Sequence, residues 1–108
     1  MEIRVQSVKF NADQKLLDFI EKKVNKLSRF FDDVIRTEVI LSLLPDVDNK
    51  NVKIKVMIPG NDLVVEKNAS TFEDAVVDCV AVLKDQLVRT KEKRGDVRKK
   101  MPVDELIG

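Results

Sequence analysis

Apolar residues repeat with the period of an α-helix in two long stretches of the chain. After Ser70 they recur mostly in steps of three and four and fall within one arc about 100° wide, which predicts a helix with one buried stripe. The stripe consists of Phe72, Val76, Cys79, Val80, Leu83 and Leu87. Ser70 and Glu73 have the spacing of a capping box, so we expect this helix to begin at Ser70 and Gly95 to interrupt it.

The other helical stretch comes earlier, from Asn11 to about Phe31. Asn11 is a favourable N-cap with Gln14 three residues later, and Asp13 places negative charge in the first turn, where the helix dipole favours it. The predicted core face consists of Leu16, Phe19, Ile20, Val24, Leu27 and Phe31. This single apolar face predicts an amphipathic helix that packs on another element.

Four segments alternate apolar and polar residues with the period of a β-strand. They are residues 2–10, 34–44, 52–58 and 62–68. The second places Ile35, Thr37, Val39, Leu41 and Leu43 on one face, and the third places Val52, Ile54, Val56 and Ile58 on one face. Pro59-Gly60 suits the centre of a type II turn between the last two strands.

The order of elements predicts an α+β fold of the form β-α-β-β-β-α. A right-handed crossover makes the first two strands parallel neighbours, and short turns make the other three strands an antiparallel meander. Each strand has one apolar face, so we expect two parallel helices on one side of a four-stranded mixed sheet. We expect one domain over residues 1–95 and a flexible tail, basic and then apolar, over residues 96–108.

Composition limits the functions that this fold can carry. The chain has 108 residues, enough for one domain, and its net charge of +1 gives no argument for a nucleic-acid partner. It has no His, three dispersed Gly residues and one Cys on the apolar stripe, so we expect no enzyme, metal site, cofactor or small-molecule substrate. With no apolar run long enough to span a membrane and no signal-peptide pattern, we expect a cytoplasmic protein without a membrane partner.

The placement of the cations is more informative than their total. One basic stripe beside the core face of the first helix consists of Lys15, Lys22, Lys26 and Arg29, and Lys23 falls within the apolar arc. The second helix ends in the cations Arg89, Lys91, Lys93, Arg94, Arg98, Lys99 and Lys100. This pattern suits structured RNA, bound through phosphates and shape, whereas the open sheet face mixes both signs and lacks aromatic residues for base stacking. The alternatives are an ordinary amphipathic helix and a solvated helix end.

Three groups of residues also carry a resemblance. They are Leu16-Leu17-Asp18-Phe19-Ile20 with Lys23, Lys26 and Leu27; Phe30-Phe31-Asp32; and Leu83, Gln86-Leu87 and Lys91-Glu92-Lys93. With the order of elements from residue 2 to about residue 94, they make the chain similar to the ribosome hibernation-promoting factors, also called ribosome-associated inhibitors, in their short form.

This resemblance implies a fold related in shape to double-stranded-RNA-binding domains, and a function without catalysis. Members of the family dock on the small ribosomal subunit, in the channel for messenger RNA and the anticodon ends of transfer RNAs. They contact ribosomal RNA through basic residues of the two helices, and they block initiation in stationary phase or stress. We therefore expect the small subunit and its RNA as partners, and a monomer off the ribosome.

The RNA-binding residues follow from the resemblance and from helical geometry. Lys23, Lys26, Arg89, Lys91 and Lys93 fall where the family carries cations, and helical geometry adds Lys22, Arg29, Lys84 and Arg94. The chain departs from the family at Val82 and Asp85, where many relatives have Lys or Arg, and at Val77, where many have Asp. The middle of the second helix is therefore less cationic than in those relatives.

Two other functions fit the same fold. One is a protein-interaction module that uses the open sheet face, with Ile40, Met57 and Val64 as an apolar patch. The other is general binding of double-stranded RNA. Whether the two basic flanks line one groove or two separate surfaces depends on how the helices pack.

Overall fold

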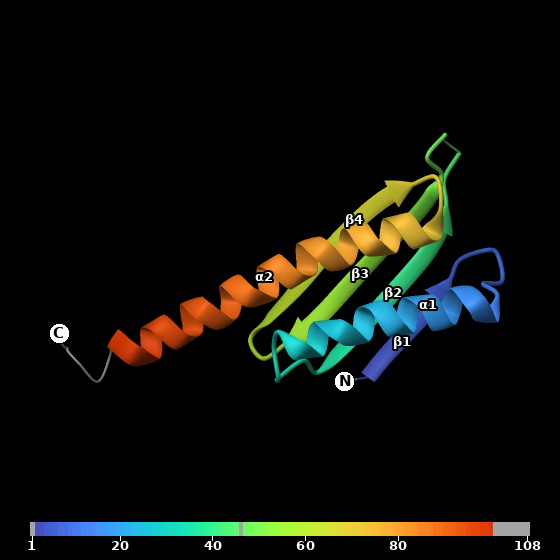
Figure 1. The fold of residues 1–108 in the computed structure, drawn as a ribbon. Coiled ribbons are helices and arrows are strands. Elements are labelled where there is room, and N and C mark those ends of the chain that lie inside the picture. The colour runs from blue at the N-terminus through green and yellow to red at the C-terminus, as the bar shows by residue number, and fades with distance from the viewer. Residues whose placement is uncertain (1, 46, 101–108) are drawn as a thin grey trace.

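Four strands form one sheet, and two helices lie side by side on one of its faces (Figure 1). The computed structural model describes residues 2–45 and 47–100, the last seven of these by their backbone alone. The elements are β1 (Glu2–Ser7), α1 (Gln14–Asn25), the 3-10 helix η1 (Lys26–Arg29), β2 (Arg36–Leu43), β3 (Lys50–Ile58), β4 (Asn61–Ala69) and α2 (Phe72–Lys100). This arrangement confirms the predicted α+β class and the order β-α-β-β-β-α.

The sheet has the predicted mixed topology, with the strands in the order β1-β2-β3-β4. β1 is parallel to β2 and pairs Val5 with Val39, whereas β2–β3 and β3–β4 are antiparallel. The connection from β3 to β4 is the expected two-residue turn at Pro59 and Gly60, where Gly60 has a φ of 79°. That left-handed backbone is the conformation that a type II turn requires of its third residue, and Gly adopts it without strain.

Both helices run in the same direction across the sheet, as predicted (Figure 1). α1 lies over the β1–β2 side and α2 over the β3–β4 side. Among the α2 side chains that the structure describes, up to Lys93, the last buried one is Leu87, and beyond it the helix projects past the end of the sheet (Figure 1). This projection makes the molecule 55 Å long but only 25 by 18 Å across. Gly95 does not interrupt α2, contrary to expectation, because a helix whose first half is anchored tolerates one Gly at a cost of about 1 kcal/mol.

Strand boundaries differ from the prediction at β1 and β2. β1 ends at Ser7 rather than near residue 10, because Lys9 takes a left-handed φ of 64° and turns the chain. β2 is shorter than residues 34–44, and two residues expected on its buried face are largely exposed: Ile35 (61%) and Leu43 (49%). Both lie at the ends of the strand, beyond the cover of the helices. β3 and β4 begin and end within two residues of their predicted limits.

Both predicted helix caps are displaced along the chain. Asp13, not Asn11, caps α1, and its Oδ1 accepts a hydrogen bond of 2.8 Å from the Leu16 amide. Thr71, not Ser70, caps α2, and its Oγ1 accepts a hydrogen bond of 3.1 Å from the Asp74 amide. The sequence offers two capping residues close together at each start, and tertiary packing selects between them.

The core lies between the sheet and the two helices. Every residue of the predicted stripes is buried there except Phe19 and Val80, which are partly buried. The first helix tightens into η1 after Asn25 and does not continue as an α-helix to residue 31.

Cys79 is buried beneath α2, as predicted, and burial raises the pKa of its thiol to about 11. A thiol in this state is protonated and unreactive at neutral pH.

Candidate RNA-binding surface

The cations of the first helix lie on the flank next to α2. α1 packs its core face on the sheet beside the parallel α2, and its right-handed turn then puts Phe19 and Lys23 on the side toward α2. Both residues are half-buried, as expected between two helices. Lys22 and Lys26 follow on the solvent side of the same flank and are exposed, as is Arg29 in η1.

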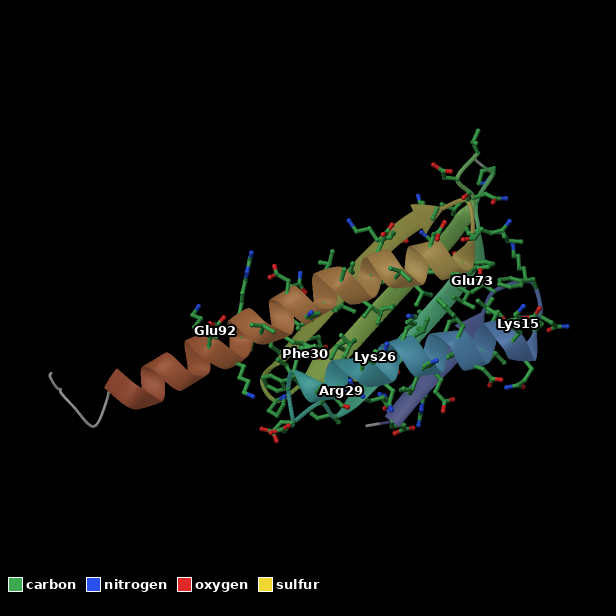
Figure 2. The ribbon with its side chains drawn as sticks, viewed as in Figure 1. Lys15, Lys26, Arg29, Phe30, Glu73 and Glu92 are labelled. Carbon is green, nitrogen blue, oxygen red and sulfur yellow. The ribbon has the colours of Figure 1, made fainter. Side chains whose placement is uncertain are left out.

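Two aromatic rings hold lysine side chains in this region. The Nζ of Lys23 lies 5.6 Å from the centroid of the Phe19 ring, so its stem follows the edge of the core as predicted. The Nζ of Lys84, on α2, lies 5.0 Å from the centroid of the Phe30 ring, which follows Arg29 (Figure 2). The second contact joins the two helices, so Lys84 adds its charge to the end of the basic stripe.

The contact with Phe30 also fixes how the other cations of α2 are oriented. At about 100° per residue, Lys91 lies two turns after Lys84 on nearly the same line and therefore faces the α1 side. Arg89 and Lys93 are rotated from Lys84 by about 140° and about 180°, so they lie on the opposite side of α2. The structure therefore separates the cations that the sequence grouped along the second helix. The side chain of Arg94 is outside the described part of the structure.

Six cations thus share one surface, which we call the interhelical surface. It consists of Lys22, Lys23, Lys26, Arg29, Lys84 and Lys91. None of the six forms an ion pair with a described carboxylate. Arg89 differs, because its Nη2 lies 3.0 Å from Oδ2 of Asp85, one turn earlier on α2. The interhelical surface can therefore accept several phosphates of one RNA without first losing a partner of its own.

The open face of the sheet is also charged, but three of its four cations are paired, and only Lys53 forms no ion pair with a described carboxylate. Arg4 bonds to Glu2 at 2.8 Å, Arg36 lies 3.3 Å from Glu38, and Lys55 lies 3.6 Å from Asp62. The bond from Arg4 also lowers the pKa of the Glu2 carboxyl. Alternating charges along each strand produce these pairs, as expected for a solvated sheet face.

The apolar patch predicted on the open sheet face is not continuous. Ile40 on β2 pairs with Lys53, and Val64 on β4 pairs with Lys55. Between Ile40 and Met57 lies the pair formed by Glu38 and Lys55. These apolar side chains are therefore interrupted by charged residues, because the strand register places each on a different row.

Two structural findings bear on other kinds of site. Within residues 2–45 and 47–100, no three His, Cys, Asp or Glu residues are grouped so that they could hold a metal ion. In the same part of the chain, no helix is both long and apolar enough to cross a membrane.

Sequence reasoning identified the cations but missed the aromatic residues that position two of them. Phe19 was expected only in the core, although Lys23 four residues later is the spacing at which side chains meet on a helix. The contact between Phe30 and Lys84 has no local signal, because the two residues are far apart in the sequence and meet only when the helices pack.

Known proteins resemble this chain in sequence and in fold. Residues 3–95 match the model of a family described as Sigma 54 modulation protein / S30EA ribosomal protein. The chain is 29% identical over 97 residues to a ribosome hibernation promoting factor of Azotobacter vinelandii, covering 87% of this chain and 86% of that protein.

Two solved structures share the fold. The N-terminal domain of Protein Y from Thermus thermophilus is 26% identical, with a TM-score of 0.74 over 83% of this chain and 99% of that one. A ribosomal subunit interface protein from Coxiella burnetii is 20% identical, with a TM-score of 0.77 over 85% of this chain and 99% of that one. The second likeness concerns the fold alone.

Proposed function

The chain belongs to the Sigma 54 modulation protein / S30EA ribosomal protein family, as its sequence predicted, and we propose that it is a ribosome-binding hibernation factor. The family is one of ribosome-associated factors, not of enzymes. The relative from Azotobacter vinelandii carries the name of a hibernation promoting factor and covers nearly the same length.

The interhelical surface is the observation that supports this proposal most directly. Its six cations come from two helices that pack side by side, and none is paired with a described carboxylate. Phosphate contacts of this kind supply affinity without reading sequence, and they suit an RNA that is recognised by its shape. The near-neutral total charge does not oppose this, because the local field depends on where the charges lie.

In its finer form, the proposal places the protein on the small ribosomal subunit, in the channel for messenger RNA and the anticodon ends of transfer RNAs. The interhelical surface contacts ribosomal RNA there, and occupancy of the channel blocks initiation in stationary phase or stress. When it is not bound to the ribosome, the protein is a monomer. It needs no cofactor.

Co-sedimentation with purified small subunits and whole ribosomes tests the proposal. We expect near-stoichiometric pelleting at about 50 mM salt and a loss of affinity of about 10³-fold at about 200 mM, as six phosphate contacts require. Messenger RNA and transfer RNA bound beforehand should compete. Protein that remains in the supernatant at low salt would refute the proposal.

General binding of double-stranded RNA is the second candidate, because the same cations and a fold of similar shape to double-stranded-RNA-binding domains suit any A-form helix. Isolated duplex RNA separates the two functions. If duplex RNA of the same total length displaces the protein as well as free small subunits do, the general function holds. If far more duplex is needed, the ribosome is the partner.

A further inference from the structure

Beyond its first turn, where Glu73 also faces α1, helix α2 carries opposite charges on different sides (Figure 2). Facing α1 are Lys84 and Lys91, part of the interhelical surface. Away from the core, four exposed carboxylates follow one another at steps of four, seven and seven residues, which places them within an arc about 40° wide. We call them the acidic ridge; it consists of Asp74, Asp78, Asp85 and Glu92. Figure 2 shows Glu92 on the side of α2 away from α1.

Arg89 lies beside this ridge and is flanked by two of its carboxylates. Asp85 stands four residues before it, with 3.0 Å between Arg89 Nη2 and Asp85 Oδ2. Glu92 stands three residues after it, the other spacing at which helical side chains are neighbours. Both side chains of the ion pair are mostly exposed, at 77% and 60%, so the pair is weak and does not itself fix Arg89.

The carboxylates act on an approaching phosphate through their field. A phosphate that binds Arg89 must come close to Asp85, which lies on the same guanidinium, and Asp85 is well within the Debye length of about 8 Å at physiological salt. Of the acidic ridge, only Asp85 and Glu92 are within one turn of Arg89, whereas Asp74 and Asp78 lie more than ten residues before it. Lys84 lies on the other side of α2 and contacts Phe30, next to Arg29 of η1.

We infer that α2 contacts RNA through its α1-facing side only: Asp85 and Glu92 keep phosphate away from Arg89, and Lys93 points to the side of α2 away from α1. This inference rests on the proposed function and refines it: the RNA lies along the interhelical surface, and the outer side of α2 faces away from it. Two residues that the family resemblance assigns to RNA binding are therefore not contacts in this chain.

Two double variants with the same change in charge test the inference. Lys84→Glu with Lys91→Glu should weaken binding to small subunits at least about tenfold and lower the slope of log K against log salt by about 2. Arg89→Glu with Lys93→Glu should weaken it less than about threefold and leave the slope unchanged. Matched Gln variants at the same four positions guard against loss of helix stability, and circular dichroism checks the fold.

A double-mutant cycle of Asp85 and Arg89 gives an independent test of the inference. Arg89→Gln should not change affinity in the unmodified chain, but it should cost about threefold in an Asp85→Asn background, where the field no longer opposes phosphate. Equal losses from the two double variants, or no coupling between Asp85 and Arg89, would overturn the inference and leave the proposed function intact. Failure of the unmodified protein to bind small subunits would overturn both.

Discussion

The helical face and the open sheet face carry comparable cations in different settings. On the open face three cations have a carboxylate partner between 2.8 and 3.6 Å away: Arg4, Arg36 and Lys55. On the helical face, the six cations of the interhelical surface have none among the described carboxylates. The comparison teaches that the number of cations does not define a site for an anionic partner; the position of the carboxylates does.

Secondary structure explains why the two faces differ. Along a strand, side chains two residues apart share a face, so Arg4 pairs with Glu2 and Arg36 with Glu38, and Lys55 reaches Asp62 on the neighbouring β4. On a helix, residues three, four and seven apart share a side, so Lys15, Lys22 and Lys26 gather. Asp18 lies beside them, but its Oδ1 accepts a hydrogen bond of 2.8 Å from Gln14 Nε2 and it forms no ion pair with a described lysine. Sorted charges therefore remain free on α1, and alternating charges neutralise one another on the sheet.

The largest expected effect comes from reversing matched pairs of lysines on the two faces. Lys22→Glu on α1 with Lys26→Glu on η1 should weaken binding to small subunits about 100-fold, because two phosphate contacts become repulsions. Lys53→Glu with Lys55→Glu on β3 makes the same change in net charge and should cost less than about threefold. Titration by co-sedimentation measures both, with thermal melting as the check on folding. Similar losses from the two pairs would show that only total charge matters.

A smaller effect should follow from removing the carboxylates that pair with the sheet cations. Glu38→Gln with Asp62→Asn frees Arg36 and Lys55, and should raise the affinity for duplex RNA about two- to fivefold at low salt. Asp33→Asn with Asp48→Asn adds the same net charge away from any described ion pair and serves as the control. If both variants gain equally, pairing is not what keeps the sheet face from binding RNA.

The smallest effect concerns pH. The chain has no His, so the contrast between the two faces in RNA binding should persist from pH 6 to 8. The buried thiol of Cys79 has a pKa of about 11, above the unfolded value near 9. Its contribution to stability is therefore complete below pH 9 and is lost as the pH rises from 9 to 11. Urea unfolding of the unmodified chain and of Cys79→Ala should give a difference in free energy that shrinks over that interval. A constant difference would show that the pKa of the thiol is the same in the folded and unfolded states.

The sequence predicted the layers of this fold well because periodicity reports burial directly. Val52, Ile54, Val56 and Ile58 alternate cleanly and are all buried, and the parallel pairing of β1 with β2 follows from the helix between them. The predicted right-handed crossover was wrong: seen from the helical side and along β1, β2 lies to the left of β1 (Figure 1). The helix starts were wrong by one or two residues, because Asn11 and Asp13, like Ser70 and Thr71, are equally able to cap.

The candidate site was only partly predictable. Lys84 and Arg89 are five residues apart and looked equivalent in the sequence, yet they point to opposite sides of α2. That difference depends on how α2 is rotated against α1, and this rotation is set by contacts between distant residues such as Lys84 with Phe30. Local patterns contain the charge of each residue but not the direction in which the packed helix presents it.

The projection of α2 beyond Leu87 has a consequence for the energetics of helix formation. An isolated segment of about a dozen residues barely forms a helix in water, because nucleation is unfavourable by a factor of about 10³. Here the packed turns from Phe72 to Leu87 already supply the nucleus, so each later residue needs only propagation. A cationic rod of this length can therefore extend from a small domain without a hydrophobic core of its own.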